Sequence, residues 1–128
     1  MIALSAAAGL VGILAAPAQA ASWESYLSSV GPNYESRRWY QPSSSTGTKI
    51  QFTGCTSGLG LANVTLYKVI ENWPDDRFTM AAFTNCFSGP TAVSTGNWND
   101  HGAGDYYFVI NEGTSGVFLT VNTVKVTY

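Results

Sequence analysis

The chain has 128 residues, of which six are Lys or Arg and eight are Asp or Glu, and its isoelectric point is near 5.1. Such a chain lacks the basic surface that binding to nucleic acid phosphates requires, so we expect no nucleic acid partner. Only 11% of the residues are charged. The exposed surface must therefore consist mainly of Ser, Thr, Asn and Gly, which is typical of secreted β proteins and suits uncharged partners.

The first 20 residues have the pattern of a signal peptide. An apolar run from Ile2 to Ala16 is broken at Pro17 and is followed by Ala18-Gln19-Ala20, the small-residue pattern that a signal peptidase cleaves. The run is shorter than the roughly 20 residues that a membrane-spanning helix needs. We therefore predict a secreted, extracellular protein that begins near Ala21 and is not held in a membrane.

The chain has two cysteines, Cys55 and Cys86, and an oxidising extracellular setting allows them to pair. A disulfide between them would close a loop of about 30 residues and stabilise the fold by roughly 3–4 kcal/mol. A metal site needs more ligands than two distant cysteines and the one histidine, His101, can supply. We predict a structural disulfide, with no metal and no other cofactor.

The segment that follows the signal peptide has apolar residues at helical spacing. They fall at i, i+3, i+4 and i+7 and are Trp23, Tyr26, Leu27 and Val30. The pattern predicts a helix that begins after Ser22 and ends at Gly31. With about nine residues, this helix would be stable only if its apolar face packed on something. We therefore predict that residues 21–35 are a docking segment, which lies either on its own domain or on a partner.

From Ser36 onward the apolar period changes to two, which is typical of strands. A turn is predicted at residues 73–76, a polar loop at residues 94–104, and a bulge near Asn122-Thr123, where the last strand changes parity. Six strands are predicted, at residues 36–41, 48–54, 62–70, 77–86, 105–110 and 117–128. The favoured fold for residues 36–128 is an antiparallel β-sandwich, Ig-like or similar, preceded by the short helix. A small closed β-barrel is the alternative.

No motif is specific enough to name a reaction. The chain has no Gly-x-Ser-x-Gly elbow, and its acidic residues do not form the pair of carboxylates that a glycosidase needs. A site centred on His101 and Asp105 is a weaker hypothesis, so we predict a protein that is not an enzyme. The polar loop from Asn97 to Asp105 has oxygen ligands suited to calcium, but ordinary Asx turns explain its composition equally well.

The aromatic residues are the better clue to function, because 13% aromatic content exceeds what one small core readily uses. One hypothesis is a module that binds another secreted protein through its N-terminal segment and nearby aromatic side chains. The residues expected to do so are Trp23, Tyr26, Leu27, Val30, Trp39 and Tyr40. The alternative is a carbohydrate-binding module that stacks sugars on Trp73 and Trp98.

The signal ending in Ala18-Gln19-Ala20, the Gly/Ser/Thr-rich body, the single cysteine pair and the run Gly-Asp-Tyr-Tyr-Phe-Val-Ile at residues 104–110 resemble the small secreted β proteins of actinobacteria. These include enzyme inhibitors and the adaptor subunits of secreted antibacterial particles such as the umbrella toxins. The resemblance covers the whole chain after the signal peptide. It implies an adaptor that joins other proteins in an extracellular toxin complex, or an enzyme inhibitor.

Overall fold

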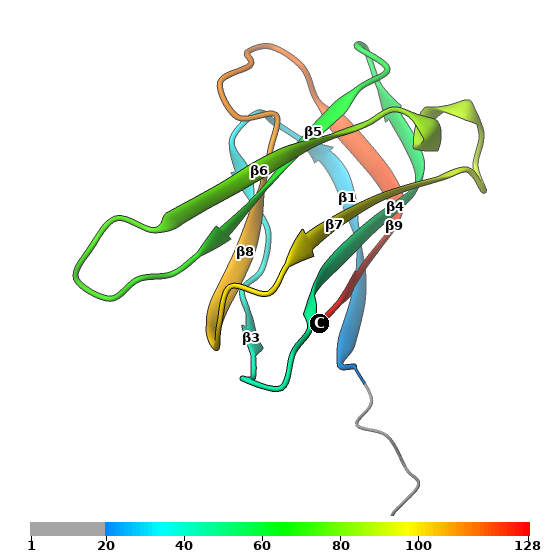
Figure 1. Ribbon diagram of the computed structural model, residues 1–128. Coiled ribbons are helices and arrows are strands. Elements are labelled where there is room, and N and C mark those ends of the chain that lie inside the picture. The colour runs from blue at the N-terminus through cyan, green and yellow to red at the C-terminus, as the bar shows by residue number, and fades with distance from the viewer. Residues whose placement is uncertain (1–19) are drawn as a thin grey trace, which may run out of the picture.

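The computed structural model describes residues 20–128 (Figure 1), so residues 1–19 of the predicted signal peptide lie outside the described residues. The described residues form two antiparallel sheets and one short 3-10 helix, which confirms the predicted all-β class. In chain order the elements are β1 (Ser22–Val30), β2 (Tyr34–Glu35), β3 (Trp39–Gln41), β4 (Gly47–Ser57), β5 (Ala62–Lys68), β6 (Asp76–Phe83), η1 (Asn85–Ser88), β7 (Val93–Asn99), β8 (Gly104–Ile110) and β9 (Leu119–Thr127).

The first sheet has the strand order β1-β9-β4-β7, and the second has β2-β8-β5-β6, with β3 also paired to β8. Buried side chains from both sheets form one hydrophobic core. Phe52 of β4 meets Phe83 of β6 edge to face with ring centroids 4.9 Å apart, and it also contacts Phe108 of β8. The arrangement is sandwich-like. Within residues 20–128 the sheets do not close into the alternative barrel.

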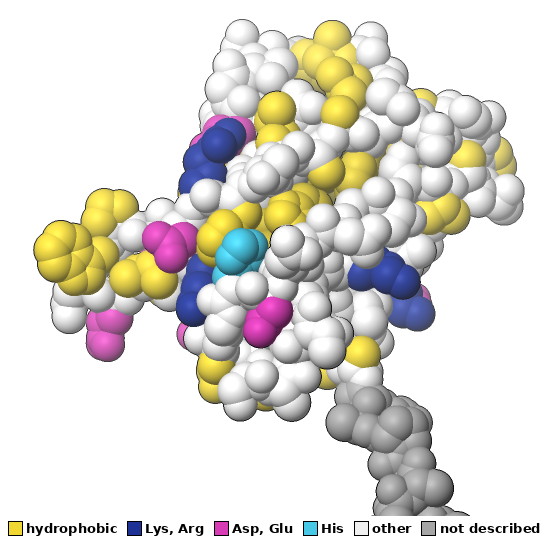
Figure 2. Space-filling view, viewed as in Figure 1, with side chains coloured by type: hydrophobic (Ala, Val, Ile, Leu, Met, Phe, Trp, Pro, Cys, Tyr) yellow, Lys and Arg dark blue, Asp and Glu magenta, His cyan; other side chains and the backbone are white. Residues whose placement is uncertain are grey.

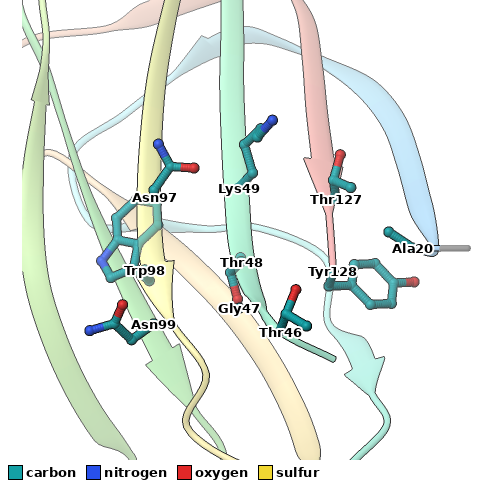
Figure 3. A pocket seen from close by; sticks show the side chains of 10 residues that line it. All are labelled: Ala20, Thr46, Gly47, Thr48, Lys49, Asn97, Trp98, Asn99, Thr127 and Tyr128. Carbon is teal, nitrogen blue, oxygen red and sulfur yellow. The ribbon is translucent and has the colours of Figure 1, made fainter. Parts of the chain in front are cut away.

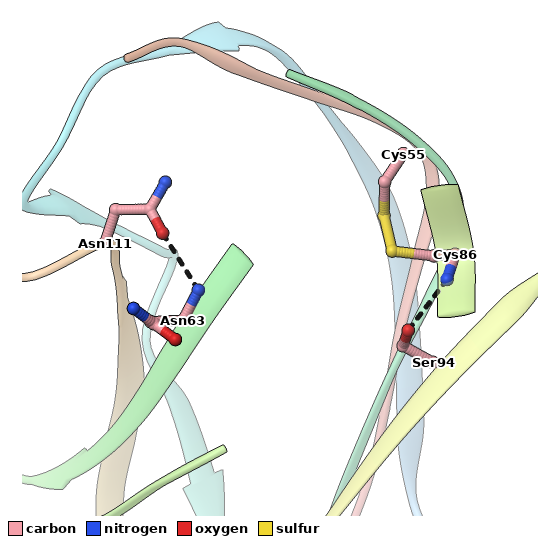
Figure 4. The surroundings of a disulfide bond; sticks show 5 residues. All are labelled: Cys55, Asn63, Cys86, Ser94 and Asn111. Atoms are coloured by element: carbon pink, nitrogen blue, oxygen red, sulfur yellow. Dashed lines mark hydrogen bonds between the residues drawn. A yellow bond between two sulfur atoms is a disulfide. The ribbon is translucent and has the colours of Figure 1, made fainter. Parts of the chain in front are cut away.

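The predicted disulfide is confirmed between Cys55 of β4 and Cys86 of η1, 31 positions apart in the chain. It fastens the crossover from β6 to β7 onto the first sheet. Beside it, the Cys86 backbone N–H donates a hydrogen bond to Ser94 Oγ at 2.8 Å (Figure 4). In the same view Asn111 Oδ1 accepts the Asn63 backbone N–H at 2.8 Å, which joins the end of β8 to the start of β5.

The predicted N-terminal helix is wrong, because residues 22–30 form β1, an edge strand that pairs with β9 in the first sheet. The pairing shifts register twice, and the second shift places an extra residue of β1 between Leu27 and Val30. This shift brings Val30 instead of Ser29 toward the core. The side chains that pack on the core, Trp23, Leu27 and Val30, therefore fall at i, i+4 and i+7 and imitate helical spacing. Residues 22–30 are thus an edge strand of the first sheet.

The irregularity predicted near Asn122-Thr123 is confirmed. These residues lie where the pairing of β1 with β9 first shifts register. The neighbouring strand β4 changes its inward parity at the same level, at Gly54, whose φ is +66°. A Cβ at Gly54 would lie only 2.8 Å from the backbone oxygen of Pro90. Glycine is required here by both the backbone conformation and the space.

Several predicted boundaries also differ from the structure. Of the predicted strand 36–41 only residues 39–41 are strand, as β3, and the two-residue β2 ends just before it at Glu35. Between β2 and β3, Ser36 Oγ, rather than a backbone oxygen, accepts the Phe108 backbone N–H. The predicted strand 77–86 ends at Phe83, since Cys86 lies in η1. The polar loop predicted at residues 94–104 contains β7, which pairs with β4 from Asn99 back to Val93.

Candidate functional site

The structure separates the predicted partner-binding residues into two groups. Leu27 and Trp39 are buried in the core, with 6% and 3% of their surface exposed. Trp23 and Val30 pack against the same core. The exposed members are Tyr26, which is 67% exposed on β1, and Tyr40 on β3. The six residues therefore do not form one outward-facing surface.

Trp39 lies at the centre of an internal aromatic cluster. Its ring centroid is 5.6 Å from that of Trp23, 6.4 Å from that of Tyr106 and 6.1 Å from that of Tyr128. The Trp39 Nε1–H donates to Gln41 Oε1 at 2.9 Å, a bond that is buried. Trp39 thus has a structural role in holding the ends of the two sheets together.

The two tryptophans of the glycan hypothesis have different environments. Trp98 is only 8% exposed, and its Nε1–H donates to the backbone oxygen of Thr79 at 2.6 Å, which links β7 of one sheet to β6 of the other. Trp73 is 74% exposed. Trp98 is therefore a bridge between the sheet edges, whereas Trp73 is free to meet a ligand.

Trp73 lies at the tip of the β5–β6 hairpin, which projects away from the body of the two sheets (Figure 1). We call residues 69–75 the hairpin tip. In the space-filling view hydrophobic side chains gather at the end of this projection, with acidic side chains close behind them (Figure 2). The largest of the exposed hydrophobic side chains is Trp73. The hairpin tip is therefore an apolar contact point that stands clear of the rest of the surface.

The conformation of the hairpin tip is fixed by hydrogen bonds. The backbone N–H of Trp73 donates to the Ile70 oxygen at 3.3 Å, and Asn72 between them adopts φ +66°, a conformation that Asn tolerates. Asp75 Oδ1 accepts the Ile70 N–H at 3.3 Å, and Asp75 Oδ2 accepts the Tyr107 hydroxyl of β8 at 2.6 Å. Asp75 thus bonds a nearby backbone N–H, and the hydrogen-bonded turn covers residues 70–73 instead of the predicted 73–76.

A polar cluster on the outer face of the second sheet supports the base of the hairpin. Tyr67 and Tyr107 stack with centroids 5.3 Å apart, and the guanidinium of Arg38 lies 4.5 Å above the Tyr107 ring. Glu112 accepts hydrogen bonds from the Tyr67 hydroxyl and from Arg77 Nε, the latter at 3.0 Å. These contacts join β5, β6 and the loop after β8, so the hairpin is held at its base as well as at its tip.

The same contacts shift the pKa values of the cluster. The hydrogen bond from Tyr67, and after it the bond and charge of Arg77, lower the pKa of Glu112 against the opposing effect of burial. Burial, followed by the bond to Glu112, raises the pKa of Tyr67. Burial and then Asp75 raise the pKa of Tyr107. Each shift favours the protonation state that the observed hydrogen bonds need, so we assign the cluster a structural role.

The polar loop predicted from Asn97 to Asp105 is organised around Asx-turn chemistry, as one of the two interpretations proposed. Asp100 Oδ1 accepts the Gly102 N–H at 3.0 Å. The ring of His101 stacks on Phe78 with centroids 3.7 Å apart, and no hydrogen bond joins His101 to Asp105 within the described residues. Residues 20–128 contain no group of three or more His, Cys, Asp or Glu that could hold a metal ion.

Two shallow hollows lie on either side of the end of β7. One, of about 470 Å³, is lined by Arg77, Phe78, Thr79, Asn97, Trp98, Asn99 and His101. The other, of about 420 Å³, lies at the ends of β4, β7 and β9, where amide and hydroxyl side chains surround Lys49 (Figure 3). Asn97 and Asn99 line both hollows. This part of the surface offers amide and hydroxyl hydrogen-bonding groups beside the side chains of Lys49, Arg77 and His101.

The fold and these surfaces define an all-β protein of two antiparallel sheets, with one disulfide between the first sheet and η1 and with a projecting aromatic hairpin. Comparison of the chain with known protein families, with curated proteins and with solved structures finds no match. Among the helices of residues 20–128, none is long and apolar enough to cross a membrane.

Proposed function

We propose that the protein is a secreted, non-enzymatic module that binds another extracellular protein through the hairpin tip. The observation that carries this proposal is Trp73, a tryptophan with 74% of its surface exposed at the end of a projecting hairpin. Tryptophan is among the residues that contribute most to protein interfaces when they are buried there. An unpartnered tryptophan at such a position is therefore a strong candidate for a partner contact.

The rigidity of the hairpin tip supports the same proposal. Asp75 holds the loop to β8 and to its own backbone before any partner binds. A contact that is already ordered loses less conformational entropy on binding, which increases affinity. The hairpin tip would then insert into a pocket on the partner without changing its own conformation. The contact loops of adaptor subunits and enzyme inhibitors bind in this way.

The shape of the tip favours a protein over a sugar as the partner. Trp73 projects from the surface, whereas sugar rings stack on flat or concave aromatic surfaces. Trp98, the other tryptophan of the glycan hypothesis, is buried and bonded to Thr79. A single projecting ring fits a pocket in a folded partner better than it fits a polysaccharide chain.

The test is capture of partners from the culture fluid of the producing organism by the tagged mature chain. We expect Trp73→Ala to lose a protein that the wild type retains in stoichiometric amount. Tyr26→Ala is the matched control, because Tyr26 is also an exposed aromatic residue but lies on β1. Equal thermal stability of the two variants would show that both are folded. Retention of the partner by Trp73→Ala together with its loss by Tyr26→Ala would refute a hairpin contact.

Carbohydrate binding is the second candidate, and the hollows beside β7 favour it. Their amide, hydroxyl and indole groups match the hydrogen-bonding needs of an uncharged saccharide. Retention of the chain on insoluble polysaccharide, lost in an Asn97→Ala, Asn99→Ala double variant but kept in Trp73→Ala, would establish this function in place of the first.

A further inference from the structure

A small pocket lies on the side of the molecule where the edge strand β1 of the first sheet faces β2 of the second. Its volume is about 80 Å³. Its inner wall is formed by the core side chains of Leu27, Phe108 and Val124, which are at most 6% exposed. Nothing in the candidate site described above uses this pocket, which belongs to β1 and β2 rather than to the β5–β6 hairpin.

The rim of the pocket includes two strong hydrogen-bond donors, Trp23 and Arg37. The indole N–H of Trp23 is buried and has no hydrogen-bond partner among residues 20–128. A buried donor without an acceptor is destabilising, and an acceptor supplied by a ligand would remove that cost. Because this N–H has almost no accessible surface, a ligand in the pocket can satisfy it only when the side chains that cover it move aside.

The charge at the rim is positive and unpaired. The guanidinium carbon of Arg37 lies 4.8 Å from the centre of the Trp23 ring. Arg37 forms no ion pair within the described residues, whereas the adjacent Arg38 pairs with Glu35 at 3.7 Å. No acidic side chain lines the pocket. An arginine beside a buried N–H donor and an apolar wall suits an anion attached to an apolar group.

The geometry points to a binding site for a carboxylate that carries a short aliphatic group. The carboxylate would accept hydrogen bonds from Trp23 Nε1–H and from the guanidinium of Arg37, and the aliphatic group would lie against Leu27, Phe108 and Val124. The pocket is well below the ~150 Å³ of an engineered cavity that holds benzene, so the aliphatic group must be small, such as the side chain of valine. Two kinds of molecule carry a carboxylate next to such an aliphatic group: a free branched-chain acid and the C-terminus of a peptide.

The test is a titration followed by nuclear magnetic resonance of the indole N–H groups, with Trp23→Phe used to assign the Trp23 signal. The probes are 3-methylbutanoate and its neutral analogue 3-methylbutanamide. We expect 3-methylbutanoate to shift the Trp23 indole signal saturably at millimolar concentration, and the amide to have at least tenfold weaker affinity. Arg37→Gln should weaken binding of the acid by a similar factor.

Arg38→Gln is the matched control, because it removes the same charge one residue away, on an arginine that is already ion-paired. It should bind 3-methylbutanoate as the wild type does. A valine-ending acetylated tripeptide with a free or an amidated C-terminus then distinguishes the two sources. Tighter binding of the free tripeptide than of 3-methylbutanoate would indicate a peptide C-terminus, and weaker binding would indicate a free acid. Absence of a Trp23 shift, equal affinity for acid and amide, or equal loss in Arg37→Gln and Arg38→Gln would overturn the proposal.

Discussion

Gln41 shows how a single buried polar residue can join a strand of one sheet to a strand of the other. Its side chain has no exposed surface, and Oε1 accepts hydrogen bonds from Trp39 Nε1 at 2.9 Å and from Thr48 Oγ1 at 2.6 Å. Trp39 and Gln41 belong to β3 of the second sheet, and Thr48 belongs to β4 of the first. This buried network ties the sheets together next to the aromatic cluster, which is why Trp39 cannot serve as the outward contact that the sequence suggested.

The cause of the lowered pKa of Glu112 can also be tested with single-residue changes. Because the hydrogen bond from Tyr67 and the pairing with Arg77 lower this pKa in the folded state, Glu112 stabilises the fold above its unfolded-state pKa. That stabilisation is lost as the pH falls through the folded-state pKa. We predict that Tyr67→Phe raises the pKa of Glu112 toward its ordinary value and makes stability fall less steeply with decreasing pH. Carboxyl-carbon magnetic resonance titration measures the change.

Tyr107→Phe is the control for this prediction. It keeps the stacked pair of rings but removes a hydroxyl that donates to Asp75 instead of Glu112. The pKa of Glu112 should stay the same in this variant. Identical titration of Glu112 in the wild type and in Tyr67→Phe would contradict the assigned cause.

Strand β7 shows why part of the fold was not predictable from the sequence. Its inward positions are Ser94, Gly96 and Trp98, so the usual alternation of large apolar side chains is absent. Gly96 is required because a Cβ there would lie 2.7 Å from a ring carbon of Trp98 and 3.0 Å from one of Phe83. The sequence of this segment is typical of a polar loop, because only one of the two rings that fill the space above Gly96, that of Trp98, belongs to β7, whereas Phe83 belongs to β6.

Gly96→Ala tests this packing. We predict a loss of about 1–3 kcal/mol in the free energy of unfolding, because the buried rings of Trp98 and Phe83 must move to make room. Gly58→Ala is the matched control. A Cβ at Gly58 meets nothing within 4 Å, so we expect its stability to stay within about 0.5 kcal/mol of the wild type. Urea denaturation measures both values, and equal stability of the two variants would contradict the proposed clash.

The candidate site, like the strands, was predicted from the sequence only in part. Trp73 was named for the glycan-binding alternative and not among the expected partner-binding residues, and the structure places it at an exposed tip. Its separation from Trp98 was not predictable, because the bond from Trp98 to Thr79 depends on β7 and β6 lying at neighbouring edges of different sheets. The donors of the β1–β2 pocket were missed for a related reason. A helical interpretation of residues 22–30 gave no reason to expect Trp23 beside Arg37.

At the scale of the whole molecule, the two ends of the described chain hold each other in place. Ala21 N–H donates to the Tyr128 oxygen at 2.8 Å, and Tyr128 N–H donates to the Ala21 oxygen at 2.9 Å. β1 pairs with β9 along its length and buries Leu27 in the core. The first sheet thus depends on contacts between the two ends of the chain, as is common in slow-folding β proteins.

This dependence predicts the effect of removing residues 21–30. Deletion would expose the edge of β9 and uncover the core beneath Leu27, and a domain of this size has only about 5–15 kcal/mol of stability in total. We therefore expect the deletion variant to lose cooperative thermal unfolding and near-ultraviolet circular dichroism, whereas Tyr26→Ala, a change on the exposed side of the same strand, keeps both. A deletion variant with native melting behaviour would restore the interpretation of this segment as a detachable docking element. If the deletion variant unfolds as expected, its failure to bind a partner would show only that the fold is lost. Point variants such as Trp73→Ala are then needed to locate the contact.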